Sequence, residues 1–233
     1  MNLRTTFATL GAVAIVIGAP NVANADRLGT AIKEIGTSTR LIEDVTANPN
    51  NRIPASLLRD SQGIVILTNV AQGGLIVGGR GGDGVLLVRQ PDGAWGNPAF
   101  VKTGGGNIGF QAGFKKGDII LLLMTRSAVN RILTGAVEFG GNVSGVAGPI
   151  GATPVDPNKV KGEILTYSFV DGGLYGGVTL EGGTFGFEDK VNEDFYDVEN
   201  ITPEEVLFNP EFIVPTGDRE IFNLHQALQA AES

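Results

Sequence analysis

The 233-residue chain contains no cysteine, one histidine, two methionines and one tryptophan. Without cysteine there is no disulfide scaffold, no thiolate metal site, no cysteine nucleophile and no lipid-modified cysteine. The single histidine, His225, excludes a metal site built from several histidines, and no Gly-x-Ser-x-Gly sequence supplies a serine nucleophile for it. The sequence therefore predicts a protein that is not an enzyme, with no catalytic residues, no cofactor and no bound metal.

Excess positive charge is also missing. The formal net charge is −8, and residues 188–233 contain 12 acidic and 2 basic side chains, whereas residues 26–187 contain 13 acidic and 14 basic ones. A nucleic-acid partner requires a basic surface, so this class of partner is excluded. The acidic segment is typical of a solvated face that aids solubility. The alternative is a surface for a protein partner.

Long apolar runs are scarce, and the longest candidate lies at the N-terminus. Arg4 precedes an apolar stretch over residues 7–18, and Ala23-Asn24-Ala25 follows as a small-x-small cleavage sequence. The stretch is shorter than the roughly 20 residues that span a bilayer. We therefore expect a signal peptide over residues 1–25, cleavage after Ala25, and a secreted or periplasmic protein. A retained N-terminal anchor is the alternative.

Glycine is the residue that the chain has in excess. Thirty of its 35 glycines fall between Gly63 and Gly186, and they alternate with runs of Val, Ile, Leu and Phe. β-Branched and aromatic residues favour strands, and glycine within strands marks bulges, bends or close backbone approach. The composition predicts an α+β fold that is predominantly antiparallel β, a curled sheet or barrel with flanking N- and C-terminal helices.

Periodicity and turn residues give the expected elements. Asp26 is predicted to cap a helix that ends near Ala47, Pro54 to open a short helix, and Asp218 to cap the last helix. Further helical segments are expected at 127–133, 192–196 and 203–207. Turns are expected at Pro91-Asp92-Gly93 and at Lys116-Gly117-Asp118. Strands are predicted at residues 63–68, 75–79, 85–89, 100–102, 107–114, 119–124, 137–146, 164–170, 174–180 and 184–187.

One glycine motif has the residue spacing of a nucleotide-binding pattern but lacks the helix that this pattern requires. Gly104-x-Gly106-x-x-Gly109 has the spacing of the dinucleotide fingerprint. That fingerprint works because a helix follows it and its N-terminal amides bind the pyrophosphate. The residues that follow, Phe110-Gln111-Ala112-Gly113-Phe114, favour a strand instead. We therefore do not assign nucleotide binding to this motif.

The order of the glycine motifs resembles a known family. In chain order they are Ile53-Pro54-x-x-Leu57-Leu58, Gly74-x-x-x-Gly78-Gly79-Arg80-Gly81-Gly82-x-Gly84-Val85, Asp92-Gly93-x-Trp95-x-x-Pro98-Ala99-Phe100, Gly109-x-Gln111-x-Gly113, Gly148-Pro149-x-Gly151, and Gly173-Leu174-Tyr175-x-Gly177-Val178-x-Leu180-Glu181-Gly182. Together they resemble the SYLF domain, which is shared by a yeast actin-regulator family and many bacterial secreted proteins, the type expected here. The resemblance spans about residues 27–200. We expect a SYLF-like domain at 26–200 and an acidic helical extension at 201–233 packed on it.

The resemblance implies lipid binding, in eukaryotic members especially of phosphoinositides, and actin binding in fungal members. The leading prediction is a noncatalytic lipid or membrane-surface binding module of the cell envelope or extracellular space. A structural or protein-interaction module with a possible envelope protein partner is the alternative. Aromatic rings suit the membrane interface and basic groups suit lipid headgroups. For the rings, packing in the core is the alternative. The candidate residues are Trp95, Phe100, Phe110, Phe114, Arg80, Lys102, Lys115 and Lys116.

Overall fold

The structure is a computed structural model that describes residues 22–47, 53–74, 77–108, 113–134, 145–147, 163–170, 173–174, 184–209 and 218–233. Its centre is an open sheet with the strand order β5-β6-β4-β1-β2-β3-β8, in which β7 pairs with β6. All these pairings are antiparallel except β5 with β6, which is parallel. The predicted α+β class is confirmed. Of the two predicted forms, the structure has an open sheet and not a closed barrel.

The strands and helices follow one another along most of the described chain. The strands are β1 (Gly63–Gly74), β2 (Val77–Val88), β3 (Ala99–Ile108), β4 (Gly113–Leu123), β5 (Gly145–Ala147), β6 (Ile164–Val170), β7 (Gly173–Leu174) and β8 (Thr184–Phe187). The helices are α1 (Val22–Ala47), α2 (Ala55–Asp60), α3 (Arg126–Leu133), α4 (Asp189–Tyr196), α5 (Pro203–Phe208) and α6 (Asp218–Ala231).

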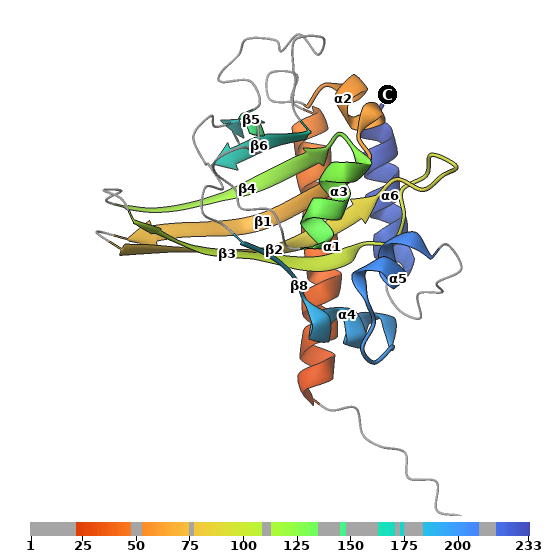
Figure 1. The fold of residues 1–233 in the computed structure, drawn as a ribbon, viewed down its shortest axis with the longest axis horizontal. Helices are drawn as coiled ribbons and strands as arrows, with labels where there is room; N and C mark the ends of the chain where they lie inside the picture. Colours follow the sequence, from red (N-terminus) through yellow and green to blue (C-terminus); the bar gives the residue numbers. More distant parts are fainter. Residues whose placement is uncertain are drawn as a thin grey trace, which may run out of the picture.

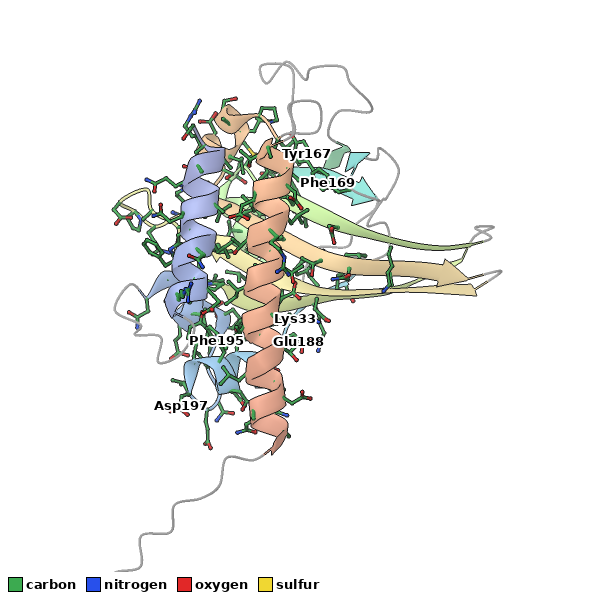
Figure 2. All side chains as sticks on the ribbon, turned by 180° about the vertical axis from the view of Figure 1, so that it is seen from behind. Lys33, Tyr167, Phe169, Glu188, Phe195 and Asp197 are labelled. Atoms are coloured by element: carbon green, nitrogen blue, oxygen red, sulfur yellow. The ribbon has the colours of Figure 1, made fainter. Side chains whose placement is uncertain are left out.

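Helices cover one end of the sheet on both faces. Figure 1 shows α3 in front of the sheet and α1 and α6 behind it, and Figure 2 shows α1 and α6 side by side from the other side. Four consecutive residues of β1, Ile64 to Leu67, are completely buried. A strand buried on both faces needs apolar side chains at every position. We call this part of the four long strands, residues 63–67, 84–88, 99–103 and 119–123, the sheet base.

The other halves of the same strands run past the helices. In Figure 1 β1 to β4 extend to the left beyond every helix, and we call this part the glycine-rich tongue. It comprises residues 70–74, 77–82, 104–108 and 113–117, of which 11 are glycine. The strand pairing shifts register at residues 68–71, where Asn69 adopts a left-handed conformation with φ 54°. A β-bulge therefore separates the sheet base from the tongue.

Several predicted boundaries are wrong. Helix α1 begins at Val22, so Asp26 lies inside the helix and does not cap it. The strands predicted at 75–79 and 85–89 belong to the single strand β2, and the turn predicted at Lys116-Gly117-Asp118 lies within β4. In these places glycine continues a strand because the neighbouring strands supply hydrogen-bond partners on both sides. Most residues predicted as strand at 137–146 and 174–180 lie outside the described ranges.

Other local predictions are confirmed. The turn at residues 91–93 is present, with Gly93 at φ 88° and the Asp92 side chain accepting a hydrogen bond from the Ala94 amide at 2.9 Å. Helix α5 begins with a capping box between Thr202 and Glu205, and the last helix begins at Asp218 as expected. Short helices with such end signals can be placed from local sequence alone.

Candidate functional site

The register of the tongue brings three basic residues of two strands, β2 and β4, together. In the antiparallel pairing, Lys115 of β4 lies opposite Gln72 of β1, which lies opposite Arg80 of β2. The neighbouring row contains Lys116, Ala71 and Gly81. Since adjacent strands are about 4.8 Å apart, the backbones of Lys115 and Arg80 are about 10 Å from each other. Residues that are 35 positions apart in the sequence thus share one small area of sheet.

The charge of this area is of one sign. Residues 70–82 and 104–117 contain Arg80, Lys115 and Lys116 and no acidic residue, in a chain whose formal net charge is −8. The Lys116 side chain is exposed. Among the described elements, no helix covers the tongue in either view (Figure 1, Figure 2). Clustered basic groups at an accessible projection are suited to a surface that carries negative charge.

Acidic side chains gather at the root of the tongue, where α1 meets the β-bulge. The hydroxyl of Thr68 donates a hydrogen bond to Glu34 Oε1 at 2.7 Å, and the amide of Asn69 donates one to Asp118 Oδ1 at 2.8 Å. Burial raises the pKa of both carboxyl groups, and the nearby carboxylate of Asp83 raises the pKa of Glu34 further. The bulge is therefore held by polar contacts whose strength depends on pH.

Two of the aromatic candidates belong to the core. Trp95 is 7% exposed, its ring lies 3.8 Å from the guanidinium of Arg89, and its Nε1 donates a hydrogen bond to Glu232 Oε1 at 2.8 Å. Phe100 is 3% exposed and contacts the ring of Phe195 edge-on at 4.9 Å. Both rings lie in the sheet base or beside it. Their contacts correspond to core packing, the other role that the sequence allowed for them.

The remaining candidates divide between the tongue and other places. Lys102 is in the sheet base, where its ammonium pairs with Glu188 at 2.7 Å and the pKa of Lys102 is raised by that carboxylate. The backbones of Arg80, Phe114 and Lys115 are in the tongue strands. Phe110 lies outside the described residues. Of the eight predicted residues, the structure thus brings Arg80, Phe114, Lys115 and Lys116 together.

Sequence reasoning missed a groove between α1 and α6. It has a volume of about 830 Å³. Its walls are Gly36, Thr39, Arg40, Glu43, Thr46 and Ala47 on α1, and Glu220, Asn223, Gln226, Ala227 and Ala230 on α6. The two helices are separated by more than 170 residues in the sequence, so no local pattern indicates that they meet. Figure 2 shows the two helices next to each other along this groove.

A polar cluster at the opposite end of the sheet from the tongue was also missed. Arg89 donates to the carbonyl oxygens of Leu58 and Gly93, both at 3.0 Å, and pairs with Glu232 at 2.7 Å. The Arg89 and Glu232 side chains are only 11% and 17% exposed. Through these contacts the C-terminal end of α6 binds to the end of the sheet. Buried pairs of this kind are stable only when their hydrogen bonds are satisfied, as they are here.

Two features are absent from the described residues, a metal-binding cluster and a membrane-spanning helix. Across those ranges, no group of three or more His, Asp or Glu side chains has a geometry that could hold a metal ion. Among the helices of the described chain, none combines the length and the apolar character needed to cross a membrane.

The single histidine, His225, is half-buried on α6. His225 contacts the carbonyl oxygen of Gly96 at 3.0 Å, and burial lowers the pKa of His225.

Comparison with known proteins gives a consistent match. The family described as "Ysc84: Las17-binding protein actin regulator" matches residues 104–231. "SH3 domain-containing YSC84-like protein 1" of Xenopus laevis is 29% identical over 76% of this chain and 52% of its own length. "SH3 domain-containing protein PJ696.02" of Schizosaccharomyces pombe is 35% identical over 62% of this chain and 34% of its own length. "LAS seventeen-binding protein 3" of Saccharomyces cerevisiae is 31% identical over 66% of this chain and 34% of its own length. The chain thus spans about half of the animal relative and a third of the two fungal ones.

Proposed function

The chain belongs to the Ysc84 family, and from that premise we propose that it is a noncatalytic binding module whose glycine-rich tongue contacts anionic lipid surfaces. The observation that carries the proposal is the gathering of Arg80, Lys115 and Lys116 in two adjacent rows of the sheet, in a part that no described helix covers. Each basic residue near an anionic membrane contributes about 1 kcal/mol. Successive strand residues alternate between the two faces of a sheet, so Arg80 and Lys115 occupy one face and Lys116 the other. The three contribute together when the tongue meets the membrane with its end. Phe114, in the row next to Lys115, adds an apolar group of the kind that enters the interface.

The small size of the tongue residues supports a surface contact in preference to a pocket. Eleven of its 21 residues are glycine, so few side chains stand between its backbone and a flat surface. The basic residues belong to β2 and β4, whose tongue halves project beyond the helices (Figure 1). The acidic helices α4 and α5 lie away from the tongue, so their charge does not oppose the contact directly. We further propose that the protein acts in the cell envelope or outside the cell, after removal of residues 1–25.

Vesicle flotation tests the proposal. We expect the protein to float with phosphatidylcholine vesicles containing phosphatidylglycerol and to be released by 0.5 M salt, because salt screens exposed charges. The double variant Lys115→Glu with Lys116→Glu should bind at least ~100-fold more weakly, since two attractive contacts become repulsive. Lys190→Glu is the matched control, because Lys190 is exposed on α4. Flotation that is unaffected by the tongue variant, or equally reduced by the control, would refute the proposal.

A second function, the capture of a protein partner, is favoured by the acidic surface of α4 and α5. Residues 188–205 contain eight acidic side chains and one lysine. Removal of the whole acidic segment would not test this function, because Phe195, Leu224 and Leu228 are fully buried and belong to the core. Charge reversal at the exposed Glu199 and Glu204 is the suitable change. With purified Las17 as the probe, we expect retention by the unmodified protein and loss with the reversed one; no retention at all excludes this partner.

A further inference from the structure

The outer surface of α1 carries a charge pattern that is complementary to itself. Along the groove, Arg40 and Glu43 are exposed, and they lie at equal distances from the midpoint of the α1 wall, which runs from Gly36 to Ala47. If a second α1 lies antiparallel across this midpoint, Arg40 of each copy faces Glu43 of the other. The same operation places Gly36 opposite Ala47. A two-fold axis produces this kind of reciprocal contact.

Within the described part of the chain, neither charged side chain forms an ion pair. Arg40 donates a hydrogen bond to the Thr37 hydroxyl at 3.1 Å. Among the ion pairs of the described residues, none includes Arg40 or Glu43, although residues three apart on a helix can pair. Both side chains are therefore available to a partner. Arg40 and Glu43 lie one turn apart on the exposed side of a long, well-supported helix.

Gly36 is an unusual residue for the middle of a helix. A β-carbon added there would meet no atom within 4 Å, so packing within the chain does not require glycine. Glycine in a helix interior is about 0.5–1 kcal/mol less stable than alanine. What glycine permits is the close approach of another backbone. The adjacent groove of about 830 Å³ provides space for the side chains of a second helix.

We propose that the protein forms a two-fold symmetric dimer in which α1 and α6 of one copy pack on α1 and α6 of the other. The axis passes between Leu41 and Ile42, Arg40 of each copy pairs with Glu43 of its partner, and Gly36 contacts Ala47. The α1–α6 pair of one copy then runs antiparallel to that of the other, and the four helices form a bundle between two sheets. A second copy is the occupant that fits, because the complementary charges of this face lie on one helix.

The symmetry determines where the tongues point. For two antiparallel helices, the two-fold axis is perpendicular both to the helices and to the line that joins them. Figure 1 and Figure 2 show that the tongue projects across α1, within the plane of the sheet and away from the helices. The axis therefore runs in the direction of the tongue, and both tongues of the dimer point to the same side. If the tongue binds lipid as proposed above, the dimer binds one membrane through two contacts.

The first test measures mass in solution without lipid. Sedimentation equilibrium of the full chain at micromolar concentrations should give a dimer. Arg40→Glu and Glu43→Arg should each raise the dimer dissociation constant at least ~100-fold, because two ion pairs become two like-charge contacts. An equimolar mixture of these two variants should recover the dimer, since every contact is again between opposite charges. Lys116→Glu, a change in the tongue, should leave the mass unchanged.

The second test determines the register and uses the absence of cysteine. A mixture of Gly36→Cys and Ala47→Cys chains should form a disulfide-linked pair upon mild oxidation. Gly36→Cys alone should not, because two copies of residue 36 are eleven residues apart along the helices, or about 16 Å at 1.5 Å per residue. A disulfide requires α-carbons within about 7 Å. The proposal is overturned by a monomer at 100 μM, by a dimer that the Arg40 and Glu43 variants leave intact, or by equal cross-linking of Gly36→Cys alone.

Discussion

The sheet base and the glycine-rich tongue are made from the same four strands but are stabilised in different ways. In the base, Ile64 to Leu67 of β1 and Ile120 to Leu123 of β4 are completely buried. In the tongue, Gly81 and Lys116 are exposed and half of the residues have no side chain. The base therefore gains its stability from apolar burial, and the tongue from backbone hydrogen bonds along the strands.

This difference shows that a long strand can serve two purposes. Burial fixes the register in the base, because a slip of one residue would turn apolar side chains to the wrong face. The tongue has no such constraint from its own residues, and the base imposes the register on it. The positions of Arg80 and Lys115 in one row are thus a consequence of packing that lies well away from them.

The largest expected effect is at the border between the two regions. A β-carbon on Gly84 would lie 2.0 Å from the carbonyl oxygen of Ile66 in the neighbouring strand. That carbonyl belongs to the sheet base and cannot move freely. We expect Gly84→Val to lower the free energy of unfolding by more than about 3 kcal/mol. Urea denaturation followed by circular dichroism measures this, and native stability in the variant would contradict the close approach.

A truncation in the base should have the next largest effect. Ile66 is fully buried in β1. Ile66→Ala removes apolar contacts and leaves a cavity, which typically destabilises a protein by about 2–5 kcal/mol. The same urea titration gives the value. A loss of less than 1 kcal/mol would show that the base is not the main source of stability.

The carboxyl of Glu34, at the root of the tongue, should make a smaller, pH-dependent contribution to the free energy of unfolding. Burial raises the pKa of Glu34 in the folded state, so the folded protein binds the proton more tightly than the unfolded chain does. The associated stability is fully present below the ordinary pKa of 4.5 and is lost as the pH rises through the raised value. Glu34→Gln should therefore be more stable than the unmodified protein at pH 8, and the difference should disappear towards pH 4. Thermal melting across this range measures it; equal pH profiles for the two proteins would contradict it.

The smallest effect, and one of opposite sign, is expected within the tongue. A β-carbon on Gly104 would meet no atom within 4 Å, and its backbone is not in the left-handed region. Gly104→Ala should stabilise the protein by about 0.5 kcal/mol, because alanine restricts the unfolded chain more than glycine does. The stability changes caused by Gly84→Val and Gly104→Ala, one in the base and one in the tongue, compare the two regions most directly. A large loss of stability at Gly104 would mean that the tongue also packs tightly.

The sequence predicted the elements whose signals are local. The turn at Gly93, the short helix predicted at 203–207 and the last helix, which begins at Asp218, all depend on residues within a few positions of one another. The prediction of two strands in place of β2 is wrong, because glycine usually marks an interruption of a strand and here it does not. In the structure β1 and β3 pair with β2 along its length, so the glycines continue the strand.

The candidate site could be predicted only in part. Arg80, Lys115 and Lys116 were recognised as basic residues near glycine-rich segments, but their proximity depends on the order β4-β1-β2, which is a long-range property. For Trp95 the sequence left two roles open, at a lipid interface or in the core. Its partner Glu232 is 137 residues away, so the buried hydrogen bond could not be seen in the sequence. The groove between α1 and α6 could not be predicted for the same reason, because its two walls are far apart in the sequence.

The arrangement of the strands and helices also has a consequence for folding. Strands β1 and β2 pair across a short connection, β3 and β4 then add on either side, and α6 reaches α1 from the other end of the chain. Contacts between distant segments lose more chain entropy and form more slowly than local ones. We expect the central strands to assemble early and the contact between α1 and α6 to form late. The surface proposed for dimerisation would then exist only on chains that have finished folding, so unfinished chains would not be incorporated into dimers.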